Sequence, residues 1–184
     1  MNLAQMLMVV GAIALLGILI LNANSTVYQT TDTMYNSEFG ITAVSLATSI
    51  VEEATGKYFD EAVTTFTAGD IVDSSKFTPI AKLGPDSAET YLGGANDFDD
   101  FDDFNGLRLV YLSPTDSDAT GAKKVVRDGV RAKYYLSAKV EYVQPPNLDA
   151  AVPYPTWHKK ITVKVWSPSA KDTLTYPSVM SYWN

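Results

Sequence analysis

The sequence predicts an α+β fold in which a long N-terminal α-helix, apolar and then amphipathic, packs on a C-terminal antiparallel β-sheet. Two observations predict it. Over residues 3–21 every side chain is apolar or Gly except Gln5, and from Leu107 onward apolar and polar residues alternate with a period of two. The first pattern is typical of a helix, and the second of half-buried strands. We therefore divide the chain into a helical rod, residues 1–59, and a β-rich head, residues 60–184.

The first segment of the rod, residues 1–21, is long enough to cross a membrane. A helix over residues 3–21 is roughly 28 Å long, close to the thickness of the hydrocarbon core of a bilayer. No charged side chain occurs before Asp32. Because a secretory signal would begin with basic residues, we expect this segment to be retained.

Residues 22–36 form a polar spacer that is rich in Asn, Ser and Thr. Such side chains compete for backbone hydrogen bonds and weaken a helix, so the rod is either loosened here or kept helical by neighbouring rods. Beyond the spacer, apolar side chains recur at helical spacing and predict one buried face. Its members are Ile41, Val44, Ala47 or Thr48, Val51, Ala54 and Tyr58.

The head begins with loops rich in Gly and Pro, in which we expect one short strand at residues 77–82. The Asp-Gly pair at 128–129 predicts a hairpin turn between strands at 123–127 and 130–143. Pro177 predicts an edge strand or a bulge. Alternation predicts two sets of buried side chains, one in each of two strands: Val130, Ala132, Tyr134, Leu136, Ala138, Val140 and Tyr142 in the first, and Trp157, Ile161, Val163 and Val165 in the second.

Composition excludes several classes of function. The net charge of −7 and the lack of a Lys/Arg-rich stripe argue against a nucleic-acid partner. The chain has no Cys, which excludes thiol catalysis, zinc fingers and iron–sulfur clusters. His158 is the one histidine, and it falls on the Lys-bearing face of its strand, as a surface residue would. We therefore predict no enzyme activity, no catalytic residues and no cofactor.

Five aspartates lie close together at positions 97, 99, 100, 102 and 103. Oxygen ligands suit calcium, and the candidate ligands are Asp99, Asp102, Asp103 and Asn105, although their spacing is not that of an EF-hand. The alternative, which we prefer, is an acidic turn without a metal. In that turn Phe98, Phe101 and Phe104 anchor the loop to the sheet, and the carboxylates face water or meet Lys123, Lys124, Arg127 and Arg131.

Taken together, these segments resemble type IV pilin-like proteins. Residues 43–61 are similar to the helix end of minor pilins and type II secretion pseudopilins, and residues 98–107 resemble the acidic loop of minor pilins of the mannose-sensitive haemagglutinin type. The resemblance covers less than half of the chain. Pilin precursors usually have a basic leader and a Glu at the fifth mature position, whereas this sequence shows no leader and has Gln5.

The resemblance implies a pilin-like fold and a structural subunit of an extracellular, pilus-like filament, or fimbrium, on the cell surface. Copies of the chain would assemble through their N-terminal helices, after anchorage of the precursor in the inner membrane and with help from pilus or secretion machinery. A minor pilin or pseudopilin is the alternative, as is a membrane-anchored module for cell adhesion. The residues implied in assembly are Met1, Gln5, Val9, Ile13, Leu16 and Ile20.

Overall fold

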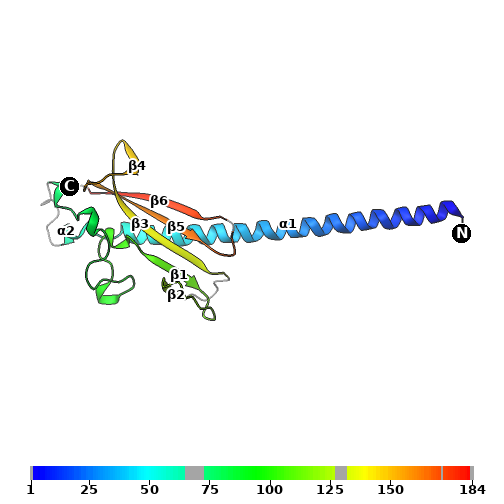
Figure 1. Ribbon diagram of the computed structural model, residues 1–184, viewed down its shortest axis with the longest axis horizontal. Helices are drawn as coiled ribbons and strands as arrows, with labels where there is room; N and C mark the ends of the chain where they lie inside the picture. The colour runs from blue at the N-terminus through cyan, green and yellow to red at the C-terminus, as the bar shows by residue number, and fades with distance from the viewer. Residues whose placement is uncertain (1, 65–72, 127–131, 171, 183–184) are drawn as a thin grey trace. The chain divides into compact units, whose positions relative to one another are not determined.

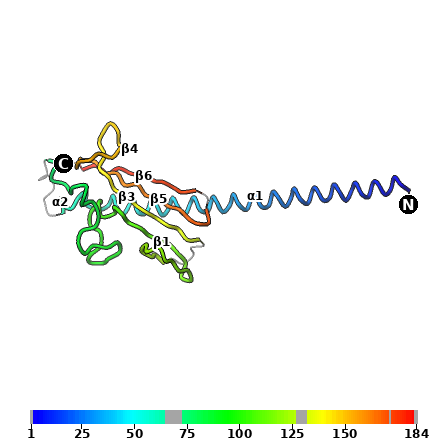
Figure 2. Tube along the Cα trace, in the orientation of Figure 1, coloured from blue at the N-terminus to red at the C-terminus, as the bar shows by residue number. Residues whose placement is uncertain are grey.

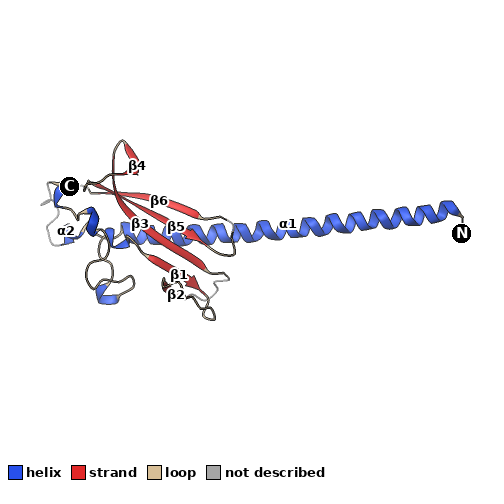
Figure 3. Ribbon diagram, in the orientation of Figure 1, coloured by secondary structure: helices blue, strands red, loops and turns tan. Residues whose placement is uncertain are grey.

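The computed structural model describes residues 2–64, 73–126, 132–170 and 172–182. It confirms the predicted fold class, a long N-terminal helix packed against a C-terminal sheet (Figures 1 and 3). The α-helices are α1 (Leu3–Thr55) and α2 (Glu61–Thr64), and the short 3-10 helices are η1 (Ser74–Lys76), η2 (Ile80–Lys82), η3 (Gly94–Asn96) and η4 (Asp102–Phe104). The strands are β1 (Arg108–Leu112), β2 (Lys123–Val126), β3 (Tyr134–Gln144), β4 (Asn147–Ala151), β5 (His158–Trp166) and β6 (Leu174–Ser181).

The chain divides into two compact units, Met1–Ile41 and Thr42–Asn184. The boundary falls inside α1, so the last turns of this helix belong to the same unit as the sheet. In that unit, Figure 2 shows the connection from residue 73 to β1 as loops gathered at the end of the sheet near the C-terminus. Ring contacts of Tyr182 with Phe59 at 5.6 Å and with Phe77 at 5.5 Å bring these segments together.

The polar spacer is helical, because α1 continues through residues 22–36 without a break. Five hydroxyl groups between residues 26 and 37 donate to the carbonyl oxygen four residues earlier, as from Thr26 to Asn22 at 3.0 Å and from Thr30 to Thr26 at 2.9 Å. The side chains that were expected to compete with the helix are thus bonded within it. Of the two alternatives, the continuous helix is the one present, and it forms in a single chain.

The face that α1 buries in the second unit overlaps the predicted one, because Ala47, Val51 and Ala54 are buried as predicted. The other predicted members are exposed, Ile41 at 73%, Val44 at 44% and Tyr58 at 57%, and the buried face includes Ala43, Leu46 and Ile50 instead. The helix has two overlapping apolar faces. The buried face includes Ala43, Ala47 and Ala54, whose small side chains let the helix lie close to the sheet. The buried set is Ala43, Leu46, Ala47, Ile50, Val51 and Ala54.

The sheet is mixed, not wholly antiparallel. Its strand order is β2-β1-β3-β5-β6, with β4 paired to β3. β1 pairs with β2 in parallel, and the other pairs are antiparallel. The predicted hairpin between β2 and β3 is therefore wrong, because β1 lies between them; its turn at 128–129 is outside the described residues. A buried apolar strand such as β1 gains from a position between two others, whereas β2 carries exposed Lys123 and Lys124 at the edge.

The predicted strand faces are confirmed for most of their members, whereas Ala132 and Trp157 are half-buried and Val130 lies outside the described residues. β3 buries Tyr134, Leu136, Ala138, Val140 and Tyr142, and β5 buries Ile161, Val163 and Val165. Pro177 lies in β6, which ends the strand order and is therefore an edge strand, as predicted. The strand expected at residues 77–82 is wrong: this segment leads into η2, with Pro79 as its N-cap. Proline lacks the N–H group that a strand ladder needs.

Candidate functional site

The predicted assembly residues lie on the part of α1 that forms the first unit. Val9 is 53% exposed, Ile13 65%, Leu16 57% and Ile20 58%, and none of residues 2–38 is buried. Met1 is outside the described residues. By length and composition this helix is apolar enough to cross a membrane. A helix that is apolar on all sides is stable only when lipid or other apolar surface surrounds it.

Gln5 makes a local contact at the start of the same helix. Its Oε1 accepts a hydrogen bond from the backbone N–H of Asn2 at 3.4 Å, and the carbonyl oxygen of Asn2 accepts from the backbone N–H of Gln5 at 2.9 Å. The side chain thus satisfies one of the free N–H groups at a helix N-terminus.

In the second unit, the acidic loop is anchored by its aromatic side chains. Phe98, Phe101 and Phe104 are buried, as predicted. The Phe98 and Phe104 rings lie 5.2 Å apart, and Tyr91 lies 5.7 Å from Phe98. The Tyr91 hydroxyl also donates to Glu53 on α1 at 2.9 Å. The loop is therefore packed on the rest of its unit by its own hydrophobic residues.

The expectation that the carboxylates of this loop face water is wrong for three of the aspartates. Asp100, Asp102 and Asp103 are buried, at 2–3% exposure. Asp100 Oδ1 accepts from the backbone N–H groups of Asp102 at 2.7 Å and Asp103 at 3.1 Å. Asp103 Oδ2 accepts from the N–H groups of Asp99 and Asp100, both at 3.0 Å. Backbone donors thus hold the loop in its fold.

The basic partner of the loop is Lys159 on β5, not one of the expected residues. Its side chain is fully buried, and its Nζ donates to the Phe59 carbonyl oxygen at 2.8 Å, to Asp60 Oδ2 at 2.7 Å and to Asp102 Oδ1. These three acceptors use all three N–H groups of the ammonium. Of the expected bases, Lys123 instead donates to the Tyr91 carbonyl oxygen, and Arg127 and Arg131 lie outside the described residues.

Asp60 joins this ion pair to the sheet and to the loop after α1. It is fully buried and accepts from the Thr78 N–H and hydroxyl groups at 3.0–3.1 Å, and from the Tyr142 hydroxyl at 3.1 Å. The Phe59 and Tyr142 rings lie 4.8 and 5.3 Å from Lys159 Nζ. Among the described residues, every buried side-chain nitrogen and oxygen has a hydrogen-bond partner. The charged group is therefore fully satisfied inside an aromatic core.

One pattern in the sequence indicates that the side chain of Lys159 is buried. It stands two residues after Trp157 and two before Ile161, so the alternation places it on the buried face of β5. An inward lysine requires a buried acidic partner. Its partners lie 57 and 99 residues away along the chain, which local spacing does not reveal.

Burial sets the protonation of the aspartates around Lys159. Burial, assisted by the charge of Asp102 and opposed by Lys159, raises the pKa of Asp100 to about 9. Burial likewise raises the pKa of Asp102, against the attraction of Lys159. Burial raises the pKa of Asp103 to about 7, with Glu89 acting in the same direction and backbone N–H groups opposing it. Desolvation thus favours the neutral acids.

We expect the free energy of unfolding to fall between about pH 5 and pH 9, by up to about 1.4 kcal/mol per pH unit for each proton released. The folded pKa values of Asp100 and Asp103 exceed their ordinary value of 3.8, so the folded state binds protons more tightly. This stabilisation is complete below the ordinary pKa and is lost as pH rises through about 7 and about 9. Denaturant unfolding in chelator-containing buffers measures it.

The neutral variant Asp103→Asn should flatten the lower part of this profile. Exposed Asp73, whose pKa is lowered by hydrogen bonds from Ser75, provides the control, and Asp73→Asn should leave the slope between pH 5 and 9 in place. Stability that rises with pH in the wild type would contradict the expected protonation.

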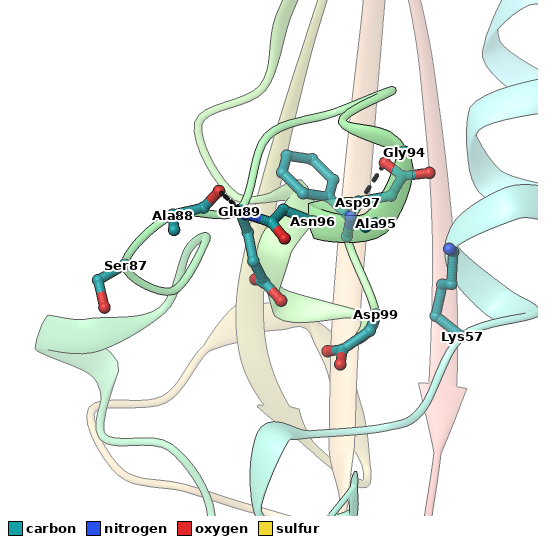
Figure 4. A pocket seen from close by; sticks show the side chains of 10 residues that line it. Lys57, Ser87, Ala88, Glu89, Gly94, Ala95, Asn96, Asp97 and Asp99 are labelled. Atoms are coloured by element: carbon teal, nitrogen blue, oxygen red, sulfur yellow. Dashed lines mark hydrogen bonds between the residues drawn. The ribbon is translucent and has the colours of Figure 1, made fainter.

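A surface cavity of about 470 Å³ lies beside the acidic loop, with Lys57, Ser87, Asn96 and Asp97 among the residues that line it. Figure 4 shows the carboxylates of Glu89 and Asp99 pointing toward each other there. Carboxylate oxygens of Glu89, Asp99 and Asp103 lie within 4.8 Å of one another. Oxygen donors at this spacing suit a hard cation such as calcium.

The structure thus brings together two of the four candidate calcium ligands, Asp99 and Asp103, and adds Glu89, which the sequence did not single out. The other two have different partners. Asp102 contacts Lys159, and the Asn105 side chain accepts from the Val140 N–H at 3.0 Å and donates to the Leu83 carbonyl oxygen at 2.9 Å. Asn105 therefore ties the loop to β3.

We expect calcium and chelator to leave the thermal midpoint of the head unchanged, because backbone and lysine donors already order the acidic loop. A ligand that binds only the folded state would raise the midpoint with its concentration. Differential scanning fluorimetry with calcium, with magnesium and with chelator measures this. A large rise with calcium that is lost in the double variant Asp99→Asn, Asp103→Asn would instead establish a metal site.

The one histidine lies at the start of β5, across from β6. His158 is half-buried, and its Nδ1 lies 2.7 Å from the Ser181 hydroxyl. This contact joins two neighbouring strands. The absence of enzyme activity stays a prediction.

No protein-family model matches this chain, and neither the curated proteins nor the solved structures provide a match.

Proposed function

We propose that the chain is a structural subunit of an extracellular, pilus-like filament. Copies assemble through the apolar part of α1, and the β-rich heads form the outer wall. Before assembly, the same helix holds the subunit in the inner membrane, from which pilus or secretion machinery extracts it. In this proposal the partners are copies of the chain, the membrane and that machinery.

The observation that carries the proposal is the exposure of the apolar helix on all of its sides. Residues 2–38 have no buried member, and Leu3, Met8, Leu15 and Leu21 are each at least 70% exposed. A bundle of identical helices would cover every side, and each helix satisfies its own backbone hydrogen bonds. A bilayer would do the same for the unassembled subunit.

The second unit supports a location of the heads on the outside. Its hydrophobic core and its buried ion pair are both formed by residues of the second unit, and its buried polar side-chain atoms have hydrogen-bond partners. A folded domain of this kind remains stable in water while the attached helix changes its surroundings. The first 41 residues can therefore move from lipid to a filament core while the head keeps its fold.

Two further candidates rest on particular observations. The similarity of residues 43–61 and 98–107 to minor pilins and pseudopilins favours a minor subunit that primes or caps a filament. A membrane-anchored adhesin is favoured by α1, the one helix of sufficient length among the described residues, and by the acidic cavity at Glu89 and Asp99. In the second case α1 is an anchor alone.

Electron microscopy of material sheared from the cell surface separates these functions. A filament subunit should appear in regular fibres, identified by antibody against the head. A minor subunit should label only a fibre tip or a sparse subset of fibres. Recovery of the chain only as a detergent-solubilised monomer would contradict the filament and support the anchored module.

We expect Gln5→Leu to reduce the yield of fibres, because it removes the one side-chain hydrogen-bond acceptor among apolar residues 3–21. A neutral hydrogen bond is worth about 1 kcal/mol, so fibre abundance should fall roughly several-fold. Quantitative blotting of sheared fibres measures the effect, and Gln5→Asn is the matched polar control. Assembly of Gln5→Leu at the wild-type level would show that the contact is dispensable.

A further inference from the structure

Lys159 and Asp102 are held against each other in the interior of the second unit. Lys159 comes from β5 and Asp102 from η4, which lie 57 residues apart in sequence. Both residues are buried, at 0% and 2% exposure, and Lys159 Nζ contacts Asp102 Oδ1. The amine of one residue is thus positioned at the carboxyl group of the other.

The surroundings favour condensation between these two groups. The rings of Phe59 and Tyr142 lie within 5.3 Å of Nζ, and the burial of both residues separates them from bulk water. An apolar environment weakens the preference for the ion pair over the neutral amine and acid, which are the forms that react. Fixing both reactants in one place replaces a bimolecular step with an intramolecular one.

The two carboxylates at Lys159 differ in what else they bind. Asp60 accepts from the Thr78 N–H and hydroxyl and from the Tyr142 hydroxyl, and these donors stabilise its anion. A carboxylate stabilised in this way is a poor electrophile. Its Oδ2, at 2.7 Å from Nζ, is well placed to accept a proton from the ammonium. Asp102 is therefore the electrophile and Asp60 the base.

We propose that Lys159 and Asp102 form an intramolecular amide bond, a covalent cross-link between β5 and the acidic loop. Asp60 takes one proton from the Lys159 ammonium, and the free amine attacks Cγ of Asp102 to form a tetrahedral intermediate. Asp60 then returns its proton to the departing Asp102 oxygen. With the second proton released by the nitrogen, this oxygen leaves as water. The ammonium and the carboxylate thus become one amide and one water, and no oxidant, reductant or cofactor is consumed.

The cross-link goes beyond the proposed function, because it is a property of the folded second unit in any cellular setting. It closes a loop of 57 residues between η4 and β5. Closing a loop covalently restricts the unfolded chain and so stabilises the fold. It also prevents separation of the acidic loop from the central strands under load.

Mass spectrometry of the full chain, purified in detergent and then denatured, tests the cross-link. Lys159→Arg keeps a cation but blocks the amide, and Lys164→Arg on the same strand is the matched control. Relative to the masses that the substitutions alone predict, the wild type and Lys164→Arg should each be lighter than Lys159→Arg by one water. Proteolysis of the wild type should yield a branched peptide that joins residues 159 and 102. In Asp60→Asn the branched peptide should be lost or strongly reduced.

The wild type alone decides the matter if a variant does not fold. Recovery of the unmodified peptides that contain Lys159 and Asp102 from folded wild-type protein would overturn the proposal. So would a branch from Lys159 to Asp60, or the loss of a water without any branched peptide, as cyclisation of a single aspartate would give. An Asp102→Asn variant provides an independent check, since its cross-link should release ammonia in place of water.

Discussion

Fibres should be absent when the chain carries Val9→Asp or Leu16→Lys, while the head remains folded. Both side chains lie on the first unit, 53% and 57% exposed in the single chain. In the helical bundle that we propose, both would be surrounded by apolar groups. An unpaired charge in such surroundings costs several kcal/mol for each subunit. Repeated at every subunit, this cost should prevent assembly. Electron microscopy and blotting of sheared material measure it.

Apolar substitutions at the same positions, Val9→Leu and Leu16→Met, are the matched controls and should assemble. Circular dichroism and the thermal midpoint should show that the head of each charged variant is intact, because its core is separate from residues 2–38. Fractionation shows whether the charged chains still reach the membrane. Fibres of normal abundance from either charged variant would rule out a buried helical core.

Lys159→Met should lower the free energy of unfolding of the second unit by at least about 3–5 kcal/mol, because it leaves buried carboxylates without their basic partner and removes the proposed cross-link. Methionine fills a similar volume, so the loss reports on Asp60 and Asp102, which remain buried without their cation. Denaturant unfolding followed by tryptophan fluorescence measures the change. It should appear as a lower midpoint of the denaturant transition.

Two variants define the cause of this loss. Lys164→Met, at an exposed position of the same strand, should change stability by no more than about 0.5 kcal/mol. The triple variant Lys159→Met, Asp60→Asn, Asp102→Asn should recover part of the loss, because it removes the uncompensated charges. If Lys159→Met were no more destabilising than Lys164→Met, the buried pair would have no role in stability.

The periodicity of the sequence was sufficient to predict those helices, strands and buried faces that depend only on neighbouring residues along the chain. Residues 3–21 are apolar or Gly except for Gln5, which specifies a helix with no polar face. Alternation in β3 and β5 placed Tyr142 and Val163 on the buried face, and spacing by three placed Phe101 inward in the acidic loop. Each of these patterns compares a residue only with its near neighbours along the chain, and the geometry of a helix or strand converts that comparison directly into a face.

The tertiary structure alone decided the features that depend on distant partners. α1 buries the stripe that contains Ala43 and not the one that contains Ile41, because the space beside the sheet selects between two apolar faces. β1 lies between β2 and β3 because the more apolar strand gains most from an inner position. Lys159 is buried because carboxylates 57 and 99 residues away meet it across the core. The free energy of such pairings arises only when the chain has folded, so no local pattern records which partners will meet.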